Sequence, residues 1–122
     1  MKNLLLLILL TVFGFNLLAQ EINIIPQPAY LKVESAKKTF VIDAKTQIVV
    51  IDSSLVYSAD FLNDYLQKYY KLKLNITNVT PSKNFISLVS DTSISTFDNA
   101  YTLNTSDKSI FISGTSKPGV FY

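Results

Sequence analysis

Apolar and polar residues alternate with a period of two along most of the chain after residue 28. Such alternation predicts short β-strands, because successive side chains of a strand point to opposite faces of the sheet. The stretch 47–51, QIVVI, is denser in β-branched residues, which indicates a strand covered on one or both faces. The stretches with this pattern are 29–33, 39–42, 47–51, 72–77, 85–90, 100–105 and 109–114.

One segment has the longer period of an amphipathic helix. Its apolar residues recur at steps of three and four, and they are Leu55, Ala59, Leu62, Leu66 and the pair Tyr69/Tyr70. Polar residues at 52–54, DSS, precede it and supply side-chain oxygens that can cap the first free N–H groups. The sequence therefore predicts a helix that starts near residue 55 and turns one face inward. No glycine follows it to end the helix in the usual way.

A second helix is expected to start at the C-terminal end of the sequence. Ser116 is followed by Lys117 and Pro118, and a polar cap before a proline in the first turn is typical of a helix N-terminus. The sequence stops soon afterwards at Tyr122. We therefore expect a fragment that is truncated in its last helix and that folds poorly alone, because this helix is needed to cover the sheet.

The order of these elements indicates the fold class. Strands come first, then one helix, then strands that include a hairpin across the polar turn 106–108, and then the second helix. This order predicts an α+β fold, a two-layer sandwich in which helices pack on one face of a mixed β-sheet.

The first 19 residues have the pattern of a secretory signal peptide. Lys2 precedes an apolar run through Phe15, and Ala19 stands before the polar Gln20, where we expect cleavage. The apolar run is shorter than the roughly 20 residues that a bilayer span needs. The sequence thus predicts an exported protein, periplasmic, at the cell surface or secreted, with one domain over residues 20–122 and no membrane span after cleavage.

Composition excludes several kinds of chemistry. The chain has no histidine and no cysteine, so it offers neither the usual soft metal ligands nor a Ser-His-Asp or Cys-His constellation. Its formal net charge is +2, and all its cationic side chains are lysines, which argues against nucleic acid as a partner. Asp60 and Asp64 lie one helical turn apart; a cation site is conceivable there, but a solvated face is the preferred interpretation. We expect no catalytic, cofactor-binding or metal-binding residue in this chain, and no cofactor.

The tyrosines leave a second class of function open. Exposed tyrosine rings can stack on sugars, so a stand-alone secreted carbohydrate-binding module is an alternative, although core packing is the preferred role of these residues. They are Tyr30, Tyr57, Tyr65, Tyr69, Tyr70, Tyr101 and Tyr122.

Read together, these motifs resemble a known family. A Pro-x-Pro entry at 26–28, the strand QIVV, an amphipathic helix and the closing stretch AYTLNTSDKSIFISGTSKPGVFY resemble the N-terminal accessory domain of bacterial β-N-acetylhexosaminidases of glycoside hydrolase family 20. The most specific part of the resemblance is the joint pattern over residues 100–122. It covers essentially all of the chain after the signal peptide.

The resemblance implies that a catalytic (β/α)₈ barrel follows this domain and that the barrel binds the glycan substrate. In the family, an Asp–Glu pair on the barrel assists attack by the substrate's own 2-acetamido group. No residue of this chain matches that pair, so the implied role is non-catalytic support of the barrel. Related domains also precede barrels that act on other N-acetylglucosamine-containing or uronic-acid substrates, which leaves the specificity of the parent enzyme open.

Overall fold

A computed structural model describes residues 27–33 and 39–121 of the chain. These residues belong to two units, one up to Val33 and one from residue 34 onward. The described part of the first unit, 27–33, has no regular secondary structure, and its side chains are mostly exposed. The strand predicted at 29–33 is therefore wrong: all five side chains are exposed, so no apolar face is buried that would favour pairing.

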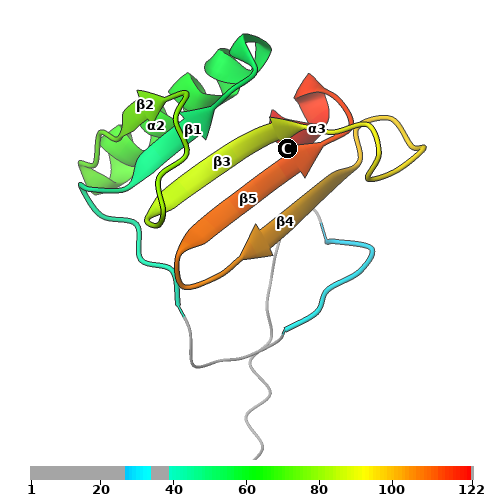
Figure 1. The fold of residues 1–122 in the computed structure, drawn as a ribbon, viewed down its shortest axis with the longest axis horizontal. Coiled ribbons are helices and arrows are strands. Elements are labelled where there is room, and N and C mark those ends of the chain that lie inside the picture. Colours follow the sequence, from blue (N-terminus) through cyan, green and yellow to red (C-terminus); the bar gives the residue numbers. More distant parts are fainter. Residues whose placement is uncertain (1–26, 34–38, 122) are drawn as a thin grey trace, which may run out of the picture. The chain divides into compact units, whose positions relative to one another are not determined.

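The second unit contains a five-stranded sheet and its helices (Figure 1). In chain order the elements are β1 (Gln47–Val50), the 3₁₀ helix η1 (Ser53–Leu55), α2 (Val56–Tyr70), β2 (Asn75–Thr77), β3 (Phe85–Ser90), β4 (Tyr101–Thr105), β5 (Ser109–Gly114) and α3 (Lys117–Phe121).

The sheet is mixed, with the strand order β2-β1-β3-β5-β4. The pairs β2–β1, β1–β3 and β3–β5 are parallel, and α2 forms the crossover between β1 and β2 that a parallel pair requires. Strands β4 and β5 are antiparallel, with Thr102 opposite Ser113, which confirms the predicted hairpin.

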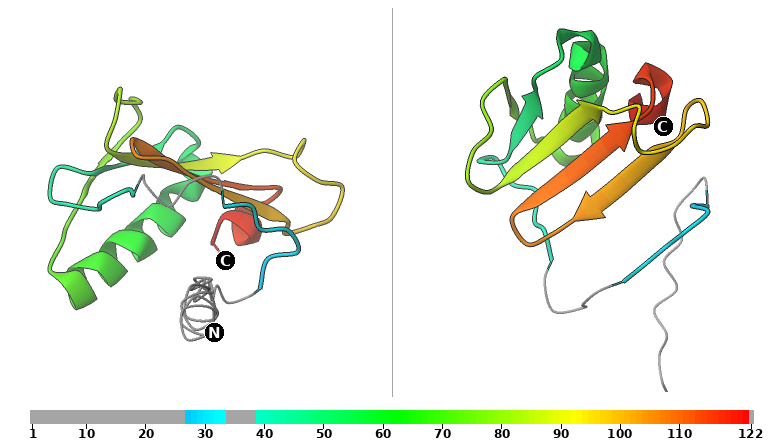
Figure 2. Two further views of the ribbon diagram at one scale, coloured as in Figure 1. Left: turned by 90° about the horizontal axis from the view of Figure 1, so that it is seen from below. Right: turned by 45° about the vertical axis from the view of Figure 1, so that its right-hand side comes forward.

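Both helices lie on the same face of this sheet, as the edge-on view in Figure 2 shows. One side of the inner strands supplies the core, which also takes in residues of η1 and both helices; its buried members are Ile48, Val50, Leu55, Ala59, Leu66, Leu74, Ile86, Leu88 and Val120. The structure thus confirms the predicted α+β sandwich. Among the described residues, no helix combines the length and apolar character needed to cross a membrane.

Local hydrogen bonds set the two ends of the first helical segment. The Asp52 carboxylate accepts from the Ser54 N–H at 2.9 Å, as the capping pattern predicts. At the other end Lys71 adopts the left-handed conformation, with φ of 59°, and its N–H reaches the carbonyls of Leu66 and Gln67. A lysine therefore takes the position that glycine more often fills, which explains how α2 ends without a glycine.

Two further strand predictions need correction. Residues 39–42 form no strand. Phe40 and Ile42 pack against the core while Val41 is exposed, so the alternation indicates which side chains are buried but not that the backbone pairs in a sheet. The strand expected over 72–77 is reduced to β2. Its first half does not pair because the Asn63 side chain occupies both backbone groups of Leu74.

Candidate functional site

The two aspartates considered for a cation site lie on the exposed side of α2. Asp60 and Asp64 are both exposed, one turn apart. Within the part of the chain that the structure describes, no group of three or more His, Cys, Asp or Glu side chains comes close enough to hold a metal ion. Among the described residues, the structure therefore adds no third acidic ligand to the pair Asp60 and Asp64.

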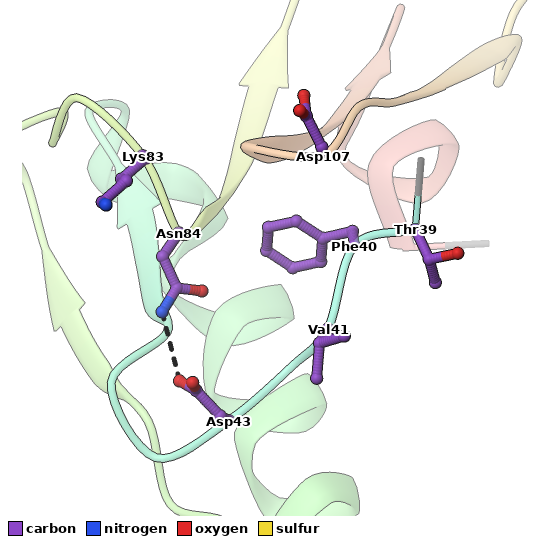
Figure 3. A pocket seen from close by; sticks show the side chains of 7 residues that line it. All are labelled: Thr39, Phe40, Val41, Asp43, Lys83, Asn84 and Asp107. Carbon is purple, nitrogen blue, oxygen red and sulfur yellow. Dashed lines mark hydrogen bonds between the residues drawn. The ribbon is translucent and has the colours of Figure 1, made fainter. Parts of the chain in front are cut away.

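An open hollow of about 310 Å³ lies beside the N-terminal ends of β1 and β3 (Figure 3). Its polar side is a hydrogen-bonded network: the buried Thr46 hydroxyl donates to Asn84 Oδ1 at 2.7 Å, and Asn84 Nδ2 donates to the Asp43 carboxylate at 3.1 Å. The lining residues are Thr39, Phe40, Val41, Asp43, Lys83, Asn84 and Asp107.

The backbone of Asn84 explains what this network does. Its carbonyl accepts from the N–H of Gln47 at the start of β1, and its own N–H donates to the carbonyl of Lys108 in the β4–β5 turn. Asn84 has a φ of 59°, a left-handed conformation that asparagine tolerates better than most residues. The network therefore connects the N-terminal ends of β1 and β3 with the turn of the β4–β5 hairpin. This is a structural role.

Hydrogen bonds in this network also change how Asp43 titrates. The Asn84 amide, followed by the Lys45 backbone N–H, lowers the pKa of the Asp43 carboxyl below its ordinary value of 3.8. Similar bonds lower the pKa of Asp52, chiefly through the Ser54 backbone N–H, and that of Asp91, chiefly through the Ser93 hydroxyl. A carboxyl whose folded pKa is depressed stabilises the fold above its unfolded pKa and loses that effect as the pH falls through the folded pKa.

We expect the stability advantage of the natural chain over Asp43→Asn to be present above pH 3.8 and to shrink as the pH is lowered further. The measurement is urea unfolding of both chains between neutral pH and pH 2. Asp60→Asn, which removes an exposed aspartate of α2, reports the effect of losing one surface charge. A stability difference for Asp43→Asn that does not change with pH would contradict the assignment.

The structure overturns the expectation that most tyrosines are packed in the core. Five of the seven have exposed side chains, and Tyr101 is half-buried, while Tyr122 lies outside the described residues. The exposed ones are Tyr30, Tyr57, Tyr65, Tyr69 and Tyr70. The helical period correctly indicated one buried stripe on α2, but Leu55, Ala59, Asn63 and Leu66 fill it, so the two terminal tyrosines remain outside.

Four of the α2 aromatic residues and one of α3 form two groups of contacting rings on either side of one groove, which Phe61 and Tyr65 both line. We call this surface the aromatic face; its members are Tyr57, Phe61, Tyr65, Tyr69 and Phe121. The Phe61 and Phe121 rings have centroids 4.7 Å apart, and those of Tyr65 and Tyr69 have the same separation. Tyr57 stacks on Phe121 at 6.2 Å. Yet all five side chains remain exposed, Tyr57 by 74%. Contiguous apolar surface of this kind marks interaction sites in soluble proteins.

A groove of about 150 Å³ runs into this face between the two helices. Its floor is formed by Leu88 of β3 and Ile112 of β5, and its walls come from α2 and α3. None of the residues that line it is charged; they are Ser58, Phe61, Leu62, Tyr65, Leu88, Ile112, Val120 and Phe121. The pattern of α2 alone could not reveal this groove, because α3 supplies one of its walls.

Hydrogen bonds around the start of α3 fix that wall in place. The Ser116 hydroxyl accepts from the Gly119 N–H at 3.3 Å and donates to Asn99 Oδ1 at 2.8 Å. Just before it, the Thr115 N–H donates to the Ala100 carbonyl at 3.0 Å. The predicted serine cap is confirmed, and it also anchors α3 to the loop that precedes β4.

The fold and this surface define the class of protein: a small α+β domain with two helices on one side of its sheet and an aromatic face between them. The family described as "Glycosyl hydrolase family 20, domain 2" matches residues 21–122, and the chain belongs to glycoside hydrolase family 20. Comparison with curated proteins finds no match.

The family match confirms the resemblance to the accessory domain. Domain 2 of this family normally accompanies a catalytic domain in the same chain. A (β/α)₈ barrel needs about 250 residues, so the matched residues hold the accessory domain without the barrel.

Proposed function

We propose that this chain is the non-catalytic N-terminal domain of an exported β-N-acetylhexosaminidase, which removes terminal N-acetylglucosamine or N-acetylgalactosamine from glycans. The match of family 20 domain 2 to residues 21–122 is the observation that carries the proposal. The domain's role is to pack on the catalytic (β/α)₈ barrel and support it, while the barrel binds the glycan.

Export is the part of the proposal that depends on the sequence alone. Residues 1–19 have the basic start, apolar run and small-residue end of a signal peptide, and they lie outside the described residues. The destination is the periplasm, the cell surface or the medium.

A second candidate function follows from the exposed tyrosines. A stand-alone carbohydrate-binding module would use rings such as Tyr57 and Tyr69 as stacking platforms, and both are exposed. The arrangement of the rings supports this role less well, since Tyr65 and Tyr69 are inclined by 46° and Phe61 and Phe121 by 50°. Tyr57 and Phe121 are the more nearly parallel pair, at 20°. Tilted rings do not form one flat platform for a sugar chain.

The proposal is tested with the polypeptide encoded by the whole reading frame, compared with residues 20–122 alone. We expect the whole polypeptide, recovered outside the cytoplasm with Gln20 as its first residue, to hydrolyse an aryl N-acetyl-β-glucosaminide, and residues 20–122 to show no turnover. The absorbance of the released phenol and the mass of the N-terminal peptide are the measurements. Binding of N-acetylglucosamine oligomers by residues 20–122, without hydrolysis by the whole polypeptide, would favour the carbohydrate-binding module instead.

A further inference from the structure

We infer that the face of the sheet opposite the helices binds a chain of neutral sugars, with the Phe111 ring as the platform on which one sugar stacks. We call this surface the open face; its members are Thr77, Val49, Ser87, Phe111, Asn104, Thr102 and Ser113. The site goes beyond the proposed function, which assigns glycan binding to the catalytic barrel, and it is separate from the aromatic face of α2 and α3.

Strand pairing brings the side chains of the open face together. Alternate residues of the strands pack into the core beneath the helices, so the residues between them point to the other side of the sheet. There, Ser87 of β3 lies between Val49 of β1 and Phe111 of β5. Thr77 of β2 and Asn104 of β4 extend this row at its two ends. Both helices lie on one side of the sheet (Figure 2), so no described helix covers the row.

The Phe111 ring is held in place for stacking. Its side chain is 38% exposed, and it meets the Phe85 ring edge-on, with centroids 5.5 Å apart and the planes at 86°. Phe85 itself is 5% exposed, so it supports the Phe111 ring from within the sheet. A ring that is already oriented loses little freedom on binding, and its apolar surface suits the C–H face of a pyranose.

Polar side chains surround this ring and lack partners of their own. Asn104 is exposed next to Phe111, and Thr102 and Ser113 are half-buried opposite each other on β4 and β5. Within the described part of the chain, none of these three side chains makes a hydrogen bond. Sugar hydroxyl groups need polar partners when they leave water, and an amide and two hydroxyl groups beside a ring can supply them.

The absence of charge selects among possible ligands. None of the five strands contains a charged residue. An anionic or cationic polymer would therefore find no charged partner on the open face, and a protein partner would be expected to meet a more apolar centre. Neighbouring strands lie about 4.8 Å apart, close to the length of one pyranose unit in an extended glycan. A neutral chain that crosses the strands can thus set one sugar over each.

The test measures how the polypeptide encoded by the whole reading frame is depleted from solution by chitin or cellulose powder, two neutral β-linked polysaccharides. We expect the natural chain to bind at least one powder. Phe111→Ala should weaken this binding about tenfold, because the ligand loses an apolar ring that covers it. Asn104→Ala alters an exposed side chain and leaves the core intact, and the loss of its hydrogen bond should weaken binding about threefold.

Two substitutions on the opposite side of the domain are the matched controls. Tyr57→Ala removes a ring of the aromatic face, and Gln67→Ala removes an exposed amide of α2. Both should bind the powders as the natural chain does. Circular dichroism of every variant establishes that the domain is folded under the conditions of the binding assay.

The other outcomes overturn the inference in distinguishable ways. Binding to neither powder, or equal binding by the natural chain, Phe111→Ala and Asn104→Ala, would remove the site. Loss of binding in Tyr57→Ala alone would move the sugar to the aromatic face. Stronger retention by immobilised heparin than by either powder would show that the ligand is anionic. Binding that depends on Phe111, without hydrolysis of an aryl N-acetyl-β-glucosaminide, would remove the hexosaminidase proposal while the open-face site stands.

Discussion

Replacing Gly114 by alanine is expected to destabilise the domain by about 3 kcal/mol, because the added methyl group meets backbone atoms that cannot move aside cheaply. A Cβ built at Gly114 falls 2.6 Å from the Gly119 carbonyl carbon, closer to the Val120 backbone nitrogen, and 2.9 Å from a Val120 methyl group. Gly114 ends β5, and α3 passes directly over it. The close approach of this helix to the strand therefore depends on the absence of a side chain.

Gly119→Ala extends this prediction to the helix side of the contact. Alanine is the better helix former by about 1 kcal/mol, so helix propensity alone predicts stabilisation. The structure predicts the opposite sign, because a Cβ at Gly119 lies 2.7 Å from the Ala100 carbonyl oxygen. Urea unfolding, followed by circular dichroism, measures the free energy of unfolding of both variants relative to the natural chain.

Neighbouring substitutions serve as controls for the two glycines. Ser113→Ala changes the residue beside Gly114 on β5, and Lys117→Ala changes an exposed residue of α3. Both are expected to alter the free energy of unfolding by less than about 0.5 kcal/mol, the usual range for substitutions away from special features. If Gly119→Ala proved as stable as Lys117→Ala, the close packing of α3 against residue 100 would be wrong.

Asn63→Leu is the second substitution with a large expected effect. The Asn63 side chain is 8% exposed; it accepts from the Leu74 N–H at 2.7 Å and donates to the Leu74 carbonyl at 2.9 Å. Leucine has a similar volume but leaves both backbone groups without a partner in an apolar site. Each unsatisfied buried group costs about 1–3 kcal/mol, so a total loss of about 3 kcal/mol is expected.

The matched control for Asn63 lies on the same helix. Gln67→Leu also replaces an amide side chain of α2 by leucine, but at an exposed position. It should leave the free energy of unfolding nearly unchanged. Thermal unfolding of the two variants separates a general effect of helix composition from the loss of the bridge to Leu74. Equal melting temperatures would show that the Leu74 backbone finds other partners, such as water.

The Asn63 bridge also explains why a strand prediction was only partly correct. Alternation over residues 72–77 indicates a strand from Leu72, but Leu74 gives both of its backbone groups to a side chain of α2. Pairing begins only at Asn75, opposite Gln47 of β1. Side-chain alternation records which residues are buried, whereas strand formation also requires free backbone groups on both sides.

The aromatic residues of α2 also show what a sequence pattern can predict and what it cannot. Their spacing could be read from the sequence, and Leu55, Ala59 and Leu66 are buried as predicted. The helical period could not decide whether Tyr69 and Tyr70 continue that stripe, because the length of the buried face depends on what packs against the last turn of the helix. Both rings are exposed in the structure, which moves them from the core to the surface.

By itself the sequence determined the local elements: the helix α2, the aspartate cap of the 3₁₀ helix η1 that precedes it, the strands β1, β3, β4 and β5, the hairpin and the serine cap of α3. Each of these depends on period and on interactions a few residues apart, which the order of residues specifies directly. Only the tertiary structure decided that Gly114 and Gly119 let α3 approach the sheet, that Asn63 holds Leu74, and that α2 and α3 enclose an aromatic groove. These features join residues distant in the chain, and the packing of the whole domain sets their separation.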